Sequence, residues 1–270
     1  MSALNHKIDF ALVFTVRTAN PNGDPIDGNR PRTTYAGFGE VSDVCLKRKI
    51  RNRWMDEGYS VFVQSDDRRV DEHRSLKARA DAVEALKEIA AKKTKKGKKK
   101  DAEAGDTSED YKRIACEEWL DVRAFGQLFA FKKTKKNSKD KSGEEMLGEE
   151  MQSNENSEEQ GSDAVSVGVR GPVSIQSAFS VNPVSITSLQ ITKSVNLETA
   201  DDPDQKGSDA MGQKHRVDFG TYVTYGSINV QMAQKTGFSE EDAEALKEAL
   251  RTIFMNDASS ARPDGSMEVI

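Results

Sequence analysis

Alternating apolar residues near the start of the chain constrain its fold most. Within residues 6–17 every second position is apolar: Ile8, Phe10, Leu12, Phe14 and Val16. A period of two residues is typical of a β-strand with one buried face. The same alternation returns in residues 164–194 and again in residues 217–230. The chain is therefore predicted to build a β-sheet from these runs.

Two stretches with apolar residues three or four positions apart predict helices. The first begins at Ser42 or Asp43, either of which can cap it, and ends near residue 57, before Gly58. Its buried positions are predicted to be Leu46, Ile50 and Trp54. The second begins at Ser239, with acidic residues in its first turn. Its apolar stripe comprises Ala243, Leu246, Leu250 and Phe254. Residues 267–270 predict the start of a final strand, an ending that suggests either a shortened sequence or a strand that closes the sheet.

The middle of the chain, residues 61–163, is predicted to be a helical insertion with charged loops. A short run before it, residues 59–63, predicts a strand. Helices are predicted over residues 66–91 and 111–131. Charged runs without the apolar spacing of a packed element are predicted to be loops: residues 92–100, 132–141 and 144–163.

Without the insertion, the predicted order is strand, helix, strand, strand, helix, strand. This is the split βαβ, ferredoxin-like arrangement of an α+β protein, an antiparallel sheet covered by two helices. Residues 196–216 form a polar excursion that is too long for a hairpin turn and too polar for a core. The arrangement supports many functions, so it decides none of them.

The composition argues against several classes of protein. A formal net charge of -5 argues against a uniformly basic nucleic-acid binder. Cys45 and Cys116 lie far apart without a paired motif, so neither a disulfide framework nor a zinc site is indicated. The apolar run from Ile8 to Val16 is too short to span a bilayer, and we expect a soluble cytoplasmic protein without a membrane partner. Phosphate-loop, dinucleotide-binding, serine-hydrolase and zinc-protease motifs are absent, and no catalytic residue, cofactor or metal is expected.

Although the net charge is negative, basic residues cluster after the first strand. Seven basic side chains lie between Arg30 and Arg53. On the predicted helix, Lys47, Arg48 and Arg51 share a strip away from the apolar stripe. Ahead of it, a loop rich in glycine and proline carries Arg30 and Arg32 near the helix N-terminus, which attracts phosphate. A sugar-phosphate backbone fits this combination, although a solvated helix face explains the strip equally well.

Two aspartates in this loop, Asp24 and Asp27, invite a metal-site interpretation. Pro25 stands where a calcium-binding loop needs a ligand or glycine, and no glutamate closes the loop. Aspartate beside glycine and proline is more often a turn former. We therefore expect a turn here.

Three stretches in order resemble a known family. They are NPNGDPIDGNRPR followed by SDVCLKRKIRN, then VRGPVSIQSAFSVNPVSITSLQITKSVN, and then MGQKHRVDFGTYVTYGSIN. They resemble the repeated backbone subunit of the type I CRISPR surveillance complex, Cascade, and are closest to subtype I-C. The resemblance implies an RNA-recognition-like palm (residues 1–60 and 164–270), a helical fingers insertion (61–163) and a thumb β-hairpin (about 191–216).

The resemblance also implies RNA-binding residues. The positions matching the family's grip on the guide backbone are Arg30, Arg32, Ser42, Lys47, Arg48 and Arg51. The thumb match places five residues near a kinked nucleotide: Lys193, Met211, Lys214, His215 and Arg216. Met211 is either a wedge between bases or an anchor on a neighbouring subunit. The two lysine-rich runs either contact DNA through unshaped charge or merely aid solubility.

The resulting expectation is a scaffold without catalytic activity. Its partners would be CRISPR RNA, target DNA paired with the guide, further copies in a head-to-tail helical filament, other Cascade subunits and the recruited helicase-nuclease. An RNA endonuclease of the type III backbone kind, using Asp24 or Asp27, is one alternative. A protein-interaction module whose basic helix binds acidic partners is another.

Overall fold

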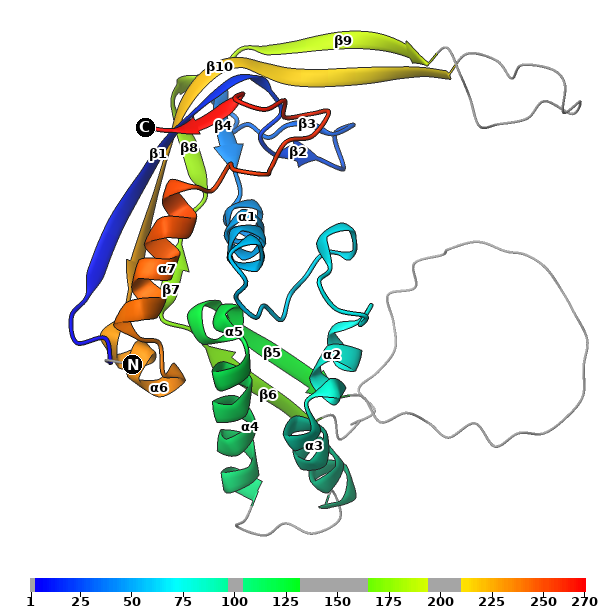
Figure 1. The fold of residues 1–270 in the computed structure, drawn as a ribbon. Coiled ribbons are helices and arrows are strands. Elements are labelled where there is room, and N and C mark those ends of the chain that lie inside the picture. Colours follow the sequence, from blue (N-terminus) through cyan, green and yellow to red (C-terminus); the bar gives the residue numbers. More distant parts are fainter. Residues whose placement is uncertain (1–2, 97–103, 132–164, 194–209) are drawn as a thin grey trace, which may run out of the picture.

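The computed structural model describes residues 3–96, 104–131, 165–193 and 210–270. Its main sheet has the strand order β11-β1-β10-β8-β4, and β7 and β9 also pair with β10 (Figure 1). All these pairs are antiparallel. The strands are β1 (Ile8–Ala19), β4 (Phe38–Val41), β7 (Val173–Ile175), β8 (Ala178–Pro183), β9 (Ile186–Lys193), β10 (Ala210–Ile228) and β11 (Met267–Val269). The predicted α+β class with an antiparallel sheet is confirmed.

Helices α1 (Asp43–Asp56) and α7 (Glu240–Arg251) lie on the same side of this sheet (Figure 1). Ser42 caps α1, because its side chain accepts a hydrogen bond from the backbone N–H of Cys45. Ser239 and Asp242 form a capping box at the start of α7. Every residue of the predicted stripes except Phe254 is buried in one hydrophobic core beneath the sheet, together with Phe14 and Tyr222, whose rings stack 5.4 Å apart. Phe254 lies beyond the end of α7 and packs against this core while partly exposed.

A second layer holds a core of its own. It comprises α2 (Leu76–Ala82), α3 (Glu84–Lys96), α4 (Ala104–Glu118), α5 (Leu120–Phe125) and the pair β5 (Gly126–Phe131) and β6 (Val165–Arg170) (Figure 1). Its buried residues include Phe62, Leu86, Tyr111, Trp119, Phe129 and Val167. Within the described residues, none of the helices is both long and apolar enough to cross a bilayer.

The strand predicted over residues 59–63 is wrong. Val61 and Phe62 are buried, but no neighbouring strand pairs with this segment in the described part of the chain. The Asp121 carboxylate accepts hydrogen bonds from the backbone N–H groups of Phe62 and Val63, at 2.7 and 3.1 Å. A side chain thus satisfies the donors that a sheet ladder would otherwise use.

The single helices predicted over residues 66–91 and 111–131 are also wrong in part. In the first, a 3-10 turn, η1 (Asp66–Arg68), precedes α2, and extended backbone at Val83 separates α2 from α3. In the second, helix α5 ends at Gly126, whose φ of 80° favours glycine, and β5 follows. The ladder with β6 makes this part of the insertion a sheet rather than a helix.

The remaining described elements are short. Strands β2 (Gly23–Asp24) and β3 (Arg30–Pro31) form a hairpin in the loop after β1, and α6 (Val230–Thr236) follows β10. The charged runs predicted over residues 132–141 and 144–163, and residues 97–100 of the run 92–100, lie outside the described residues. Residues 92–96 belong to helix α3, so the loop predicted there is wrong.

Candidate nucleic-acid interface

The loop between β1 and α1 is held in shape by its own polar groups. The side-chain oxygen of Asn22 accepts hydrogen bonds from both the backbone N–H and the hydroxyl of Ser42, at 3.0 and 2.8 Å. Asn20 donates to the carbonyl of Asn29 at 2.7 Å, and Asn29 has a positive φ of 62°. These bonds tie the loop to the start of α1, so Ser42 has a structural role in addition to any contact with a ligand.

Arg30 and Arg32 lie on this loop and are partly exposed, with 42% and 35% of their side-chain surface accessible. Arg32 Nη2 lies 3.3 Å from Asp24 Oδ1, and Arg30 Nε lies 3.8 Å from Asp27 Oδ2. Such pairs in contact with water contribute little stability, typically about 0–1 kcal/mol. The Nε atom of Arg32 is buried and has no hydrogen-bond partner among the described residues. The pair with Asp24 engages Arg32 through Nη2 and the pair with Asp27 engages Arg30 through Nε, so each guanidinium group keeps other N–H donors for an anion.

The two loop aspartates serve these arginines and the turn itself. Asp24 also accepts a hydrogen bond from the backbone N–H of Ile26 at 3.1 Å, as the sequence-based turn prediction expects. Within the described residues, no group of three or more histidine, cysteine or carboxylate side chains is placed to hold a metal ion.

The three cations of the basic strip predicted on α1 have different interaction partners. Lys47 Nζ pairs with Asp43 at 2.9 Å and remains partly exposed. Arg48 donates to the carbonyl of Val63 at 2.9 Å, and burial, followed by the neighbouring Arg51, lowers the pKa of Arg48. Arg51 is 13% exposed and its Nε lies 2.8 Å from the carboxylate of Asp121. The structure thus assigns Arg51 an internal partner, and only Lys47 and Arg48 keep surface for a ligand.

Sequence reasoning could not find the partner of Arg51. Asp121 lies 70 positions away and is 1% exposed. A buried carboxylate needs a cation and hydrogen-bond donors, and it obtains them from Arg51, Phe62 and Val63. Spacing along one helix carries no information about such a distant contact.

The segment after residue 209 pairs with β9 to form an antiparallel ribbon. This ribbon extends from the sheet (Figure 1). Residues 210–216 belong to β10, so the polar excursion predicted over 196–216 ends as a strand. Residues 194–209, and the side chain of Lys193, lie outside what the structure describes. The pairing of Met211 with Thr192 and of Arg216 with Thr187 fixes the register of the described part.

The ribbon separates the predicted thumb residues onto two faces, because strand side chains alternate. Met211, 73% exposed, shares a face with His215, which is buried and lies 2.8 Å from the hydroxyl of Ser188. Lys214 and Arg216 share the other face and are half-buried. Within the described residues neither makes an ion pair with a carboxylate. His215 is therefore placed for packing, and Lys214 and Arg216 for an anion.

The loop that carries Arg30 and Arg32 lies next to the strand that carries Lys214 and Arg216. Strand β3, which begins at Arg30, packs against β10, and Figure 1 shows the β2–β3 hairpin beneath the β9–β10 ribbon. The same loop presents two exposed side chains that are not among the predicted site residues. Ile26 is 97% exposed and Tyr35 is fully exposed, on a turn closed by the hydrogen bond from Gly37 N–H to Thr34 O. An aromatic residue between prolines and glycines was the available signal.

Comparison with known proteins supports the resemblance found in the sequence at the level of the family. The family model described as CRISPR-associated protein Cas7 matches residues 6–270. A curated relative with the same description, from Haloferax volcanii, is 26% identical over 254 residues. That match covers 91% of this chain but 63% of the relative, so the chain spans less than two thirds of the relative's length.

Two solved structures are also similar. One is described as a CRISPR RNA-guided surveillance complex, pre-nicking, with a TM-score of 0.45 and 18% identity, and the match covers 92% of this chain and 69% of that one. The other, a CRISPR RNA-guided surveillance complex, has a TM-score of 0.38 and 16% identity, covering 95% and 66%. Because the family model matches nearly the whole sequence, the chain belongs to the Cas7 family of CRISPR-associated proteins.

Proposed function

We propose that the chain is a non-catalytic subunit that binds CRISPR RNA in the backbone of a type I surveillance complex. Membership of the Cas7 family supports this proposal. The observation that carries it is that the loop bearing Arg30 and Arg32 packs against the strand bearing Lys214 and Arg216. They come from segments far apart in the sequence, yet β3 packs against β10.

The chemistry of these side chains suits a phosphate backbone. Guanidinium groups donate in a fork that matches phosphate oxygens, and the N-terminus of α1 adds backbone N–H groups. The partly exposed pairs with Asp24 and Asp27 cost little to exchange for phosphate contacts. Phosphates are the same at every nucleotide, so such contacts hold RNA without reading its sequence. In this proposal the residues that contact RNA are Arg30, Arg32, Lys47, Arg48, Lys193, Met211, Lys214 and Arg216. Ser42, Arg51 and His215 position them.

The fold supports a ferredoxin-like palm. The order β11-β1-β10-β8, with α1 between β1 and β8 in the chain and α7 between β10 and β11, is that of the split βαβ arrangement. Residues 61–163 are proposed as the fingers and 191–216 as the thumb. Assignment to subtype I-C rests on the three sequence stretches quoted above.

Assembly follows from the same proposal. Copies of the chain would join head to tail along the guide, which leaves an open helix whose ends other Cascade subunits cap. Pairing between guide and target DNA would supply the sequence specificity, and the complex would recruit a helicase-nuclease in the cytoplasm.

Salt-dependent filter binding to single-stranded RNA tests the proposed contacts. Each phosphate contact contributes about -0.7 to the slope of log K against log salt concentration. We expect Arg32→Gln combined with Lys214→Gln to flatten the slope by about 1.4. The control is Lys247→Gln, an exposed lysine on α7. An unchanged slope in the double variant, with the fold intact by circular dichroism, would reject this surface as the RNA site.

The endonuclease alternative has a separate test. Asp24 and Asp27 already pair with arginines, so no described contact favours it. We expect no cleavage when the complex is incubated with complementary RNA and magnesium. Cleavage that disappears in Asp24→Ala or Asp27→Ala would replace the scaffold proposal with a catalytic one.

A further inference from the structure

After the β2–β3 hairpin, the loop between β1 and α1 continues into a second hairpin, residues 32–40. Its two ends are joined by the hydrogen bond from Glu40 N–H to Arg32 O at 2.9 Å. The segment that begins at Arg30 therefore serves both hairpins. Pro31 is buried, and Arg30 and Arg32 on either side of it point the other way, because side chains alternate along an extended chain. Both arginines thus stand on one side of the segment that the hairpins share.

The turn of the second hairpin is fixed by hydrogen bonds on both sides. Gly37 N–H donates to Thr34 O at 2.9 Å, and Phe38 N–H donates to the Thr34 hydroxyl at 3.2 Å. The φ of 81° at Gly37 lies in the region that favours glycine. Val184 N–H, from the connection between β8 and β9, donates to Gly37 O at 3.0 Å and ties the turn to the main sheet. The residue at the tip, Tyr35, is therefore held in a defined position.

Tyr35 presents a bare aromatic ring at this tip. Its side chain is fully exposed, and among the described residues it makes no hydrogen bond, ion pair or ring contact. The fold gains no burial from this ring, although a tyrosine ring is a large apolar surface. A ligand that covers the ring would have to fix only two side-chain torsions, so the entropic cost of binding is low.

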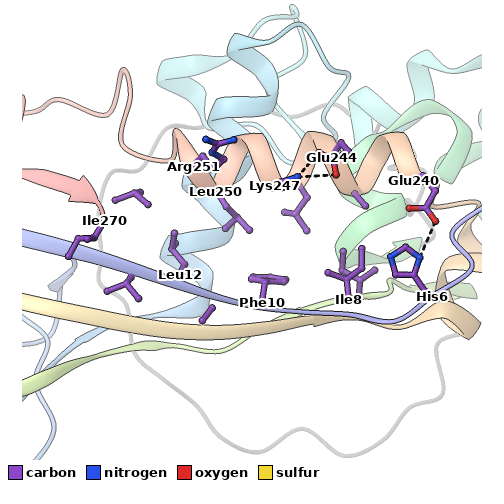
Figure 2. Close-up of a pocket in the computed structure, with 16 residues that line it drawn as sticks. His6, Ile8, Phe10, Leu12, Glu240, Glu244, Lys247, Leu250, Arg251 and Ile270 are labelled. Carbon is purple, nitrogen blue, oxygen red and sulfur yellow. Dashed lines mark hydrogen bonds and ion pairs between the residues drawn. The ribbon is translucent and has the colours of Figure 1, made fainter.

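The isolation of Tyr35 indicates the size of the ligand. Within residues 32–40 it is the one large apolar side chain that is exposed. Elsewhere, apolar residues share a concave lining, as Ile8, Phe10 and Leu12 do in a groove of about 540 Å³ beside α7 (Figure 2). A single ring offers much less area than a protein interface, which buries about 800 Å² on each partner. It is sufficient for one nucleobase, because one base stacks on one aromatic ring.

The position of Tyr35 relative to the arginines suits a nucleotide. Three residues separate Tyr35 from Arg32, which is roughly 10 Å along an extended chain. We propose that Tyr35 stacks on an unpaired base of the RNA strand whose phosphates Arg30 and Arg32 contact. This inference rests on the proposed RNA binding and adds a contact with a base to it. Every base has a π-face, so such a contact does not require a particular sequence.

A strand without bases tests the proposal. Filter binding of the full chain would compare a single-stranded RNA of mixed sequence with an abasic strand of the same length, which keeps the phosphates. We expect Tyr35→Ala to weaken RNA binding by about 5- to 150-fold, with Tm and the salt slope unchanged. On the abasic strand the same variant should have no effect. Tyr35→Phe keeps the ring and should bind RNA as the wild type does.

Tyr225→Ala is the matched control, because Tyr225 is also exposed but lies near the far end of β10 from the ribbon. It should bind both strands as the wild type does. Photocrosslinking gives a second readout: RNA that carries 5-iodouridine should crosslink to Tyr35, and the crosslink should disappear in Tyr35→Ala.

The outcomes separate this inference from the proposed function. Equal losses on the RNA and the abasic strand in Tyr35→Ala would overturn the stacked base and assign Tyr35 to a contact between copies of the chain. Unchanged RNA affinity in Tyr35→Ala, with the slope flattened as expected by Arg32→Gln and Lys214→Gln, would overturn this inference alone. A slope that the double variant leaves unchanged would overturn the proposed RNA surface, whatever Tyr35→Ala does.

Discussion

At the scale of single residues, Asp121 connects the two cores of the molecule. Its buried carboxylate receives hydrogen bonds from Arg51 on α1 and from the backbone of Phe62 and Val63, which lead into the insertion. Arg51 also stacks on Phe125, with its guanidinium carbon 5.1 Å from the ring centre. Arg51, which the sequence places in a phosphate-binding strip, therefore serves as the internal partner of a buried carboxylate.

Removing Arg51 should destabilise the fold more than it weakens RNA binding. Arg51→Ala leaves the Asp121 carboxylate buried without its cation, which we expect to cost about 3 kcal/mol of unfolding free energy. Arg48→Ala, which removes a hydrogen bond to a carbonyl, should cost about 1 kcal/mol. Urea denaturation of the two variants measures the difference. Equal losses would show that the Asp121 pair is not important for stability.

Asp71 predicts a pH-dependent contribution to stability. The hydrogen bond from Arg79, and then that from the backbone of His73, lower its pKa, although partial burial opposes them. A carboxyl with a lowered folded-state pKa stabilises the fold above its unfolded pKa, near 3.9, and loses that contribution as the pH falls through the folded value. The wild type should therefore lose more stability between about pH 5 and pH 3 than Asp71→Asn does. Parallel losses in urea titrations would contradict this assignment.

At the scale of elements, the two faces of the β9–β10 ribbon present different kinds of side chain. Lys214 and Arg216 offer charge on one face, and Met211 offers an exposed apolar side chain on the other. The N-terminus of α1 provides a comparable division, since Ser42 caps the helix while Lys47 remains partly exposed. Charge and shape are thus supplied by separate side chains of the same element.

The two faces should respond differently to salt. Lys214→Ala should flatten the log-log salt slope of RNA binding by about 0.7, because it removes one phosphate contact. Met211→Ala should weaken binding without changing that slope, and Met211→Leu should retain most of the affinity. Filter binding at several salt concentrations separates the two effects. A slope that changes with Met211 rather than Lys214 would reverse the assignment of the faces.

At the scale of the whole molecule, two cores are joined by a few buried contacts. Arg123 of α5 makes two hydrogen bonds of 2.8 Å with the carboxylate of Asp242 on α7, and Trp54 stacks on Phe125 at 5.3 Å. These contacts couple the sheet with its helices to the layer that holds β5 and β6. Cooperative unfolding of both layers should depend on them.

Breaking this junction should separate the unfolding of the two cores. Arg123→Met removes the partner of the nearly buried Asp242 and should lower stability by about 3 kcal/mol. It should also broaden the calorimetric transition relative to a two-state unfolding. Arg113→Ala, in an exposed set of ion pairs on α4, is the control and should leave the transition unchanged. A sharp two-state transition in Arg123→Met would show that other contacts couple the layers.

Elements set by local sequence signals could be predicted, whereas contacts between segments far apart in the sequence could not. Strand β1 and helices α1 and α7 followed from alternation and capping, which are local signals. The pairing of β5 with β6 and the ion pair of Arg51 with Asp121 join distant segments, so no spacing revealed them. The cations of the loop and of α1 were found from residue type, and those of the ribbon were implied by the family resemblance. Which of them are engaged internally depended on tertiary contacts.

Strand β10 runs without interruption from Ala210 to Ile228, through the middle of the sheet and out along the ribbon. At about 3.3 Å per residue it is roughly 60 Å long. The length of β10 therefore fixes how far from the sheet its outer end can make contacts. In a row of identical copies, that reach would act as a ruler and translate the length of one strand into a regular repeat.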